Sequence, residues 1–247
     1  MSETKIEVPG TDGTAEAFLY TPSHGNGPWP GVIFLTDIMG IRKANLGMAS
    51  RIAEHGYVVL VPNIFYRVSK LPVVDFELKM GDERTMKRMG ELRAGLSNAQ
   101  MGPDGAAYAD FLLAQPNVKG ASVGVAGYCF TGTMAIRTAA AAPDKIAAAA
   151  SFHGGGLYTD QPDSPHLLLS TIKARLYFGH AIEDRGMPPE AIAKLETLLK
   201  SWQGRWESET YPAHHGWTVP GRAGIYDEAQ AERHYVKLFE LLDETLK

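Results

Sequence analysis

The chain has 247 residues, a length that suits one α/β domain with a full core, so residues 1–247 are expected to form a single domain. Hydrophobic residues make up 45% and charged residues 21%, and no run approaches the roughly 20 apolar residues that span a bilayer. The formal net charge of −4 offers no basic surface for nucleic acid, and a single cysteine excludes an internal disulfide. With no apolar secretory segment at the start, a cytoplasmic protein is expected.

The first half of the chain alternates between strand and helix patterns. Residues 15–20 predict an antiparallel edge strand, and a turn over 21–28 leads to a continuous apolar run at 31–35. Such a run is typical of a strand that is buried on both faces. A helical pattern then covers 44–55 and ends at Gly56.

The second half continues in the same way. Residues 57–61 predict another buried strand, which is followed by polar helical segments over 82–116, interrupted near Gly102-Pro103. The remaining predictions are a strand that ends at the cysteine, a helix to about residue 142, strands at 146–152, 174–179 and 206–211, and helices at 189–202 and 228–246.

This alternation predicts an α/β fold with a mostly parallel sheet and helices on both faces, a three-layer sandwich. Active sites in such sheets lie at the carboxyl ends of the strands. Five chemically capable residues follow predicted strands and are therefore expected at that edge: Asp37, Cys129, His153, Asp184 and His215.

Cys129 stands in Gly127-Tyr128-Cys129-Phe130-Thr131-Gly132, between a β-prone run and an alanine-rich helix pattern. This is the layout of a nucleophile elbow, with cysteine in place of the usual serine. The alternative interpretation is a buried cysteine that acts as a small hydrophobe. The flanking glycine, strand and helix favour the elbow, and a thiol there predicts acyl transfer through a thioester.

A cysteine nucleophile needs a histidine partner and an acid that orients the histidine. In the α/β-hydrolase architecture the chain order is nucleophile, acid, histidine. Cys129, Asp184 and His215 follow this order.

Several motifs together resemble the dienelactone hydrolase family of α/β hydrolases. The shared features are Asp37-Ile38-Met39-Gly40, Val61-Pro62-Asn63, Phe65-Tyr66-Arg67, Gly127-Tyr128-Cys129, Asp184 with Pro188, and Ala213-His214-His215, from about residue 10 to the end. The resemblance implies a triad of Cys129, His215 and Asp184. It favours His215 over His214 and Asp184 over Glu183.

The chain departs from the family pattern at three positions. Thr131 replaces a glycine of the elbow, so its side chain must tolerate a close crossing or line the pocket. Asp37 often corresponds to a glutamate, so its contact with Cys129 is open. Val219 replaces the arginine that clamps the substrate carboxylate, and it is open whether Arg84 or Arg222 substitutes for it. The substrate is therefore expected to differ from dienelactone.

Further residues are assigned to the pocket. The backbone N–H groups of Ile38 and Phe130 are the expected oxyanion donors, since these donors follow the nucleophile and the third strand. The remaining pocket candidates are Asp37, Arg84, His153, Trp217 and Val219. Asp37 has an alternative interpretation as a turn residue, His153 as a loop-packing residue, and Arg84 as part of a solvated basic helix face.

We thus expect a hydrolase of carboxylic esters or lactones whose partner is a small-molecule substrate. No cofactor is expected and no metal site, because His180, Glu183 and Asp184 match no recognised ligand spacing. No nucleic acid or membrane partner is expected, and the oligomeric state, monomer or homodimer, is left open. The rival interpretation is a ligand-binding or redox-sensing protein on the same scaffold, with Cys129 exposed but weakly hydrolytic.

Overall fold

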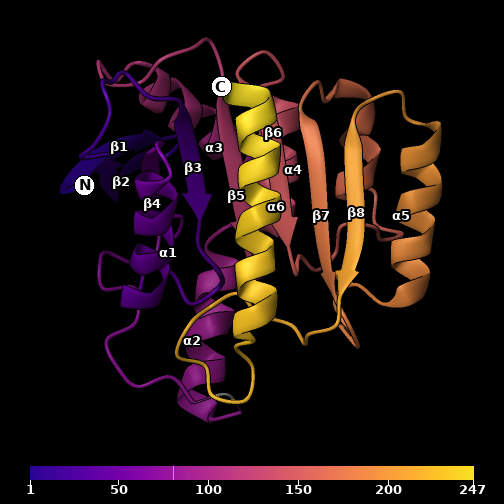
Figure 1. Ribbon diagram of the computed structural model, residues 1–247. Helices are drawn as coiled ribbons and strands as arrows, with labels where there is room; N and C mark the ends of the chain where they lie inside the picture. The colour runs from indigo at the N-terminus through magenta and orange to yellow at the C-terminus, as the bar shows by residue number, and fades with distance from the viewer. Residues whose placement is uncertain (80) are drawn as a thin grey trace.

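An eight-stranded sheet runs through the centre of the computed structural model, which describes residues 1–79 and 81–247 (Figure 1). The strands are β1 (Ser2–Gly10), β2 (Gly13–Thr21), β3 (Gly31–Leu35), β4 (Val58–Pro62), β5 (Val123–Tyr128), β6 (Ile146–Phe152), β7 (Arg175–Ala181) and β8 (Trp206–Tyr211). Their order across the sheet is β1-β2-β4-β3-β5-β6-β7-β8.

Only β2 runs against the other strands. β1 pairs antiparallel with β2, and β2 pairs antiparallel with β4, whereas the neighbours from β4 to β8 are parallel. The carboxyl ends of these parallel strands consequently meet at one edge, which is the lower edge in Figure 1. Chemistry-bearing residues that follow the strands are therefore brought together there.

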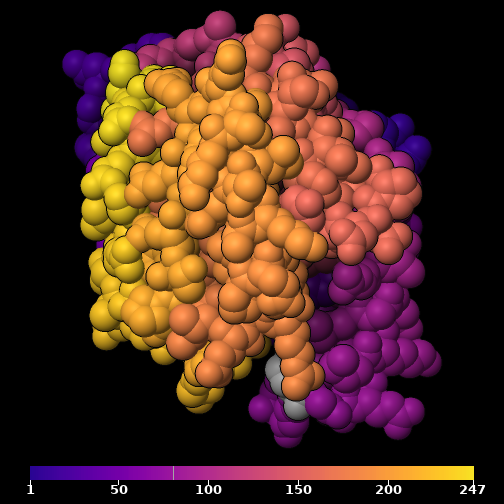
Figure 2. Space-filling model, turned by 90° about the vertical axis from the view of Figure 1, so that its right-hand side faces the viewer, coloured from indigo at the N-terminus to yellow at the C-terminus, as the bar shows by residue number. Residues whose placement is uncertain are grey.

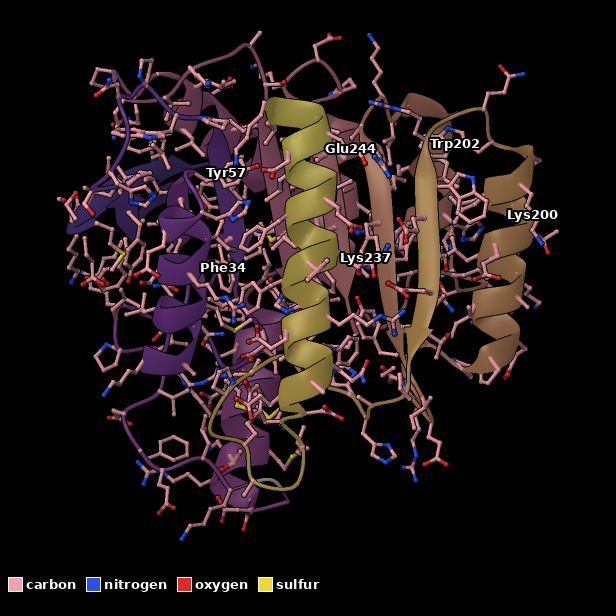
Figure 3. All side chains as sticks on the ribbon, in the orientation of Figure 1. Phe34, Tyr57, Lys200, Trp202, Lys237 and Glu244 are labelled. Carbon is pink, nitrogen blue, oxygen red and sulfur yellow. The ribbon has the colours of Figure 1, made fainter. Side chains whose placement is uncertain are left out.

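Helices cover both faces of the sheet, as expected. α1 (Lys43–Glu54) and α6 (Glu228–Leu246) pack on one face, and α2 (Glu83–Ala94), α3 (Asn98–Leu113), α4 (Gly132–Ala141) and α5 (Pro189–Ser201) contribute to the core on the other. In Figure 3, Phe34 and Tyr57 lie near α1 and α6, while Trp202 lies beside α5 at the opposite edge of the sheet. The three-layer α/β prediction is confirmed.

Local sequence explains the buried strands. Every residue of β3 and β4 is buried, because helices lie on both sides of these central strands. Gly56, which follows α1, has a φ of 101°, a left-handed conformation that glycine adopts without steric cost. Across the described part of the chain, no helix is long and apolar enough to cross a membrane.

The predicted break near Gly102-Pro103 is wrong, because Pro103 lies inside α3. The helical region divides earlier, where α2 ends at Gly95 and α3 begins after Ser97. The N–H of Ser97 donates to Oε1 of Gln100 at 2.9 Å, and this capping interaction starts the new helix. β1 was not predicted either, because only Val8 of that strand is buried and its apolar pattern is weak.

Candidate active site

The chain turns sharply between β5 and α4, and Cys129 occupies the turn. Its φ of 58° is in the left-handed region, which few non-glycine residues adopt. A Cβ on Gly127 would lie 2.2 Å from the carbonyl oxygen of Thr131, and one on Gly132 would lie 2.4 Å from Oγ of Ser151. Both positions therefore require glycine, and the strained turn has the geometry of a nucleophile elbow.

Thr131 holds the elbow from within. Its hydroxyl accepts the N–H of Tyr128 at 2.9 Å, and it lies 3.0 Å from the carbonyl oxygen of Leu35, to which it donates. The side chain is fully buried and is not among those that line the cavity described below. Thr131 consequently ties the turn after β5 to the end of β3, and its hydroxyl does not line the pocket.

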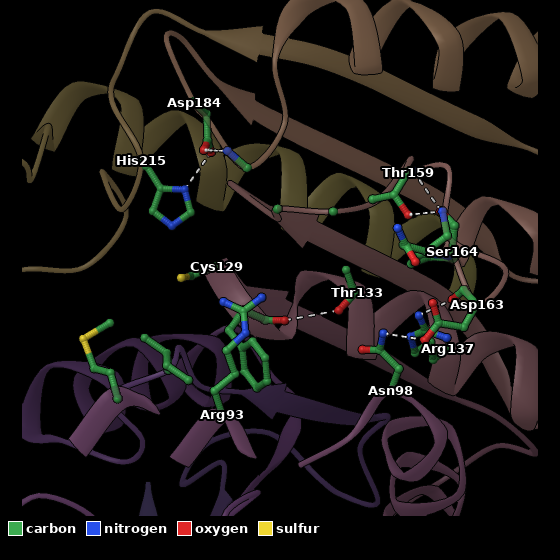
Figure 4. A pocket seen from close by; sticks show the side chains of 18 residues that line it. Arg93, Asn98, Cys129, Thr133, Arg137, Thr159, Asp163, Ser164, Asp184 and His215 are labelled. Carbon is green, nitrogen blue, oxygen red and sulfur yellow. Dashed lines mark hydrogen bonds and ion pairs between the residues drawn. The ribbon is translucent and has the colours of Figure 1, made fainter. Parts of the chain in front are cut away.

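His215 and Asp184 form a hydrogen-bonded pair above the elbow. Nδ1 of His215 lies 2.6 Å from Oδ2 of Asp184, and the N–H of Gly186 donates to the other carboxylate oxygen at 2.8 Å. Figure 4 shows the remaining imidazole nitrogen directed toward the sulfur of Cys129. The loops after β5, β7 and β8 thus bring the three residues together in the expected order.

The charges at this end stabilise one another. Burial alone lowers the pKa of His215, but hydrogen bonds with Asp184 and Cys129 outweigh it and raise the pKa to about 10. Burial raises the pKa of Asp184, but its hydrogen bond with His215 and the charge of that ring bring it below its usual value. His215 thus carries its charge next to Asp184 and close to Cys129.

The neighbouring candidates His214 and Glu183 lie outside this arrangement. Their side chains are 62% and 80% exposed, and Nδ1 of His214 lies 3.8 Å from the carboxylate of Glu183. Such an exposed pair contributes little, so the geometry supports His215 and Asp184.

A cavity of about 580 Å³ opens beside Cys129, and Figure 2 shows the surface hollowed between the purple part of the chain, which includes α2, and the orange part after β7. Its lining comprises Ile38, Met89, Arg93, Asn98, Cys129, Phe130, Thr133, Arg137, Gly155, Gly156, Thr159, Gln161, Asp163, Ser164, Pro165, Asp184, Gly186 and His215. The two expected oxyanion residues, Ile38 and Phe130, are therefore on its wall, next to the nucleophile.

Asp37 does not line the cavity. Its carboxylate accepts two hydrogen bonds from the guanidinium of Arg42, at 2.7 and 2.8 Å, and the N–H of Met39 at 2.9 Å. The expectation of a pocket acid is corrected, because these donors hold the carboxylate in the turn after β3.

Three other pocket candidates are buried behind His215 and do not line the cavity. Nε2 of His153 lies 2.8 Å from the hydroxyl of Thr218, and its ring is 5.0 Å from that of His215. Trp217 and Val219 belong to the core beneath α1 and α6. Their expected contact with substrate is corrected, since the loop after β8 turns these side chains inward. Burial holds the pKa of His153 well below its usual range, so this ring is neutral.

Arg84 does not reach the cavity either. Its side chain is 67% exposed and its Nη2 lies 3.8 Å from Asp75, which is the solvated arrangement that was the alternative. Arg222 is also absent from the lining. The cavity instead contains two arginines that sequence reasoning did not assign, Arg93 of α2 and Arg137 of α4. Thr133 follows Cys129 by four residues, and Arg137 follows Thr133 by four more. This regular spacing is the sequence signal that would have revealed Arg137.

The residues considered as metal ligands, His180, Glu183 and Asp184, lie at the end of β7 and just after it. His180 is buried, and its Nε2 lies 3.2 Å from the hydroxyl of Ser208. Burial lowers the pKa of His180 to about 4. Within residues 1–79 and 81–247, no group of three or more His, Cys, Asp or Glu side chains is placed to hold a metal ion.

Comparisons with known proteins agree with this architecture. The model of the dienelactone hydrolase family matches residues 15–246. A Synechocystis sp. protein provisionally named carboxymethylenebutenolidase is 28% identical and covers 99% of this chain and 97% of its own length. A carboxymethylenebutenolidase of Rhodococcus opacus is 27% identical over 83% of this chain and 75% of its own.

The fold also recurs among solved structures. A metagenomic dienelactone hydrolase-like promiscuous phosphotriesterase aligns with a TM-score of 0.81 at 20% identity, covering 100% of this chain and 99% of its own. The dienelactone hydrolase of Anabaena variabilis aligns with a TM-score of 0.68 at 18% identity, with the same coverage. At these identities the likeness shows the fold.

Proposed function

We propose that this chain, which belongs to the dienelactone hydrolase family, hydrolyses carboxylic esters or lactones through Cys129, His215 and Asp184. The observation that carries the proposal is the hydrogen-bonded pair of Asp184 and His215, whose imidazole is directed toward Cys129 on the wall of one cavity. The carboxymethylenebutenolidase relatives support a lactone or ester as the substrate.

In the proposed acylation, Cys129 reacts as the thiolate and His215 holds the thiol proton. The sulfur attacks the carbonyl carbon, and the carbonyl oxygen becomes an oxyanion that accepts hydrogen bonds from the N–H groups of Ile38 and Phe130. The bond to the alcohol or enol oxygen then breaks, and this oxygen takes the proton from His215. The product of this half-reaction is a thioester on Cys129 and a neutral His215.

Deacylation reverses these roles. A water molecule gives a proton to His215 while its oxygen attacks the thioester carbon. The carbon–sulfur bond breaks and releases the carboxylic product, leaving the thiolate beside protonated His215. Asp184 stays ionised throughout and orients the ring through its 2.6 Å hydrogen bond. A thiolate attacks activated acyl groups best, so enol esters and lactones are the favoured class.

Dienelactone itself is not the favoured substrate. The family clamp position is Val219, which is buried in the core and adds no cation to the cavity. The cations on the cavity wall come instead from α2 and α4. A substrate carboxylate would therefore be held at a different place relative to the nucleophile.

The test is hydrolysis of 4-nitrophenyl acetate before and after alkylation by iodoacetamide, with the Cys129→Ala variant beside it. We expect each treatment to lower kcat/KM by more than about 10³-fold, since nucleophile and base act as a unit. Circular dichroism serves as the control that the variant is folded. Clean alkylation of a protein that never hydrolyses an activated ester would overturn the proposal in favour of a binding or redox-sensing protein.

A further inference from the structure

The cavity extends away from the nucleophile along one face of the helix that follows it. Cys129, Thr133 and Arg137 are spaced by four residues, and all three line the cavity. Residues at this spacing share one side of a helix. Thr133 and Arg137 lie on α4, about 6 Å apart along its axis at 1.5 Å per residue, and Cys129 precedes this helix in the turn after β5. Figure 4 shows Arg137 beside Asn98 and Asp163, at the end of the cavity away from His215.

Arg137 is buried without a full set of partners. Arg137 is only 8% exposed, and its Nη2 donates to the backbone carbonyl oxygen of Asp163 at 2.5 Å. Nε has no hydrogen-bond partner in the structure. Among the ion pairs of the described residues, none includes Arg137.

The carboxylate of Asp163 is already engaged. Oδ2 of Asp163 accepts a hydrogen bond from the side chain of Asn98 at 2.8 Å, and Asp163 meets Arg137 through its backbone carbonyl. Its charge acts on the guanidinium only from a distance: burial lowers the pKa of Arg137 and the Asp163 charge opposes this. A guanidinium stays protonated under these conditions, so the end of the cavity holds a cation that the protein compensates incompletely.

Such a group is costly to bury, and polar groups left unpaired in a native interior need a physical reason. A ligand anion supplies one here, because the guanidinium lies on the wall of the same cavity as the nucleophile. Its planar donors match a carboxylate, which accepts two parallel hydrogen bonds from an arginine. Arg93 does not serve the same place, since it lies over the ring of Phe130, 5.6 Å from its centroid and next to Cys129.

We propose that Arg137 binds a carboxylate of the substrate, remote from the carbonyl that Cys129 attacks. This inference rests on the proposed function and gives its substrate class: esters or lactones whose acyl part carries a second, terminal carboxylate that reaches the end of the cavity at Arg137. The specificity determinant thus lies on α4, the helix that follows the turn at Cys129.

The test compares 4-nitrophenyl hemi-esters of glutaric, adipic, suberic and sebacic acids with the same compounds capped as methyl esters. We expect kcat/KM to favour the free carboxylate in the wild-type protein, with the advantage rising to a maximum at one chain length. A charge-assisted hydrogen bond corresponds to an advantage of roughly 10–100-fold. If the wild-type protein gives no advantage at any length, the proposal is overturned without any variant.

Variants then assign the advantage to a residue. Arg137→Gln is expected to lower the ratio of the two rates by at least about 10-fold, and Arg137→Lys is expected to restore part of it. The matched control is Arg84→Gln, which removes an exposed arginine outside the cavity and should leave the ratio unchanged. If Arg137 only braces the segment around Asp163, both esters slow by the same factor. If Arg93→Gln alone removes the advantage, the anion binds beside the nucleophile and the proposal is wrong.

A binding measurement separates this proposal from the catalytic one. Calorimetric titration of Cys129→Ala protein with suberate requires no hydrolysis, and we expect binding that is lost in the Cys129→Ala, Arg137→Gln double variant. If the wild-type protein hydrolyses no ester but suberate binding depends on Arg137, the proposed function fails and the anion site stands. If suberate does not bind to the Cys129→Ala protein, the anion site fails whatever the esterase result.

Discussion

The two ends of the cavity handle charge differently. At one end Asp184 and His215 form a hydrogen-bonded ion pair beside Cys129, so each of these two charges has a partner supplied by the protein. At the other end Arg137 has one backbone carbonyl and an unpaired Nε. The catalytic end is therefore complete before a ligand arrives, whereas the far end is completed by one. In our proposal, Cys129 in the turn before α4 supplies reactivity and Arg137 of α4 supplies recognition.

Breaking the catalytic end should give the largest effect. His215→Ala removes the ring that joins Asp184 to Cys129, so we expect kcat/KM for an aryl ester to fall by more than about 10³-fold. The matched control is His214→Ala, whose exposed side chain pairs only loosely with Glu183. Its rate should stay within about twofold of the wild type, since exposed pairs contribute little. A larger loss for His214→Ala would place the catalytic histidine one residue earlier.

Raising the pH should test the end of the cavity that contains His215, because the pKa of this residue is raised. Burial disfavours the charged ring of His215, but Asp184 and Cys129 raise its pKa to about 10, above the usual 6.5. A group whose pKa is raised on folding stabilises the folded state fully at pH values below its pKa in the unfolded chain. For His215 this stabilisation is lost as the pH rises through about 10. The side chain is 35% exposed, so we expect a discounted loss of at least about 1 kcal/mol in unfolding free energy.

The measurement is urea unfolding of wild-type and His215→Gln protein from neutral pH to above pH 10. Subtracting the unfolding free energy of the variant from that of the wild type removes the contribution of the lysines and tyrosines that titrate in the same pH range. The wild-type advantage should shrink as the pH rises. Parallel curves would show that His215 carries no raised pKa.

Much of the fold could be predicted because it depends on local patterns. The apolar run at 31–35 became β3 with the same bounds, and the strand and helix around Cys129 were placed correctly. β8 and α6 also match their predicted ranges. In each case a short apolar run or a helical period determines the element without reference to distant residues. β1 lacked such a signal, since its partner strand, and not its own burial, holds it in place.

The cavity wall was harder to predict, because it depends on how loops fold back. The predicted strands placed Cys129, Asp184 and His215 at one edge of the sheet, whereas nothing local shows that Trp217 and Val219 turn into the core. The choice of Arg84 failed for a similar reason. Whether an arginine of α2 faces the cavity depends on how that helix packs, and the structure selects Arg93.

Arg137 shows the remaining limit of sequence reasoning. Its position could have been inferred from the spacing to Cys129, but its missing partners could not. An arginine in an alanine-rich helix is normally read as solvated, and its burial here follows from the segment that contains Asp163 closing over α4. The unpaired Nε of this buried guanidinium is thus a property of the tertiary structure alone.

The most direct test of the account is to trap the acyl group on the enzyme. Wild-type protein is mixed with an activated aryl ester, quenched in acid within the first turnover, and analysed by intact mass and peptide mapping. We predict an added acyl group on the peptide that contains Cys129, released by neutral hydroxylamine as expected for a thioester and absent from Cys129→Ala protein. Continued turnover with the acyl group on another residue, or by the Cys129→Ala protein, would contradict the assignment of Cys129 as the nucleophile.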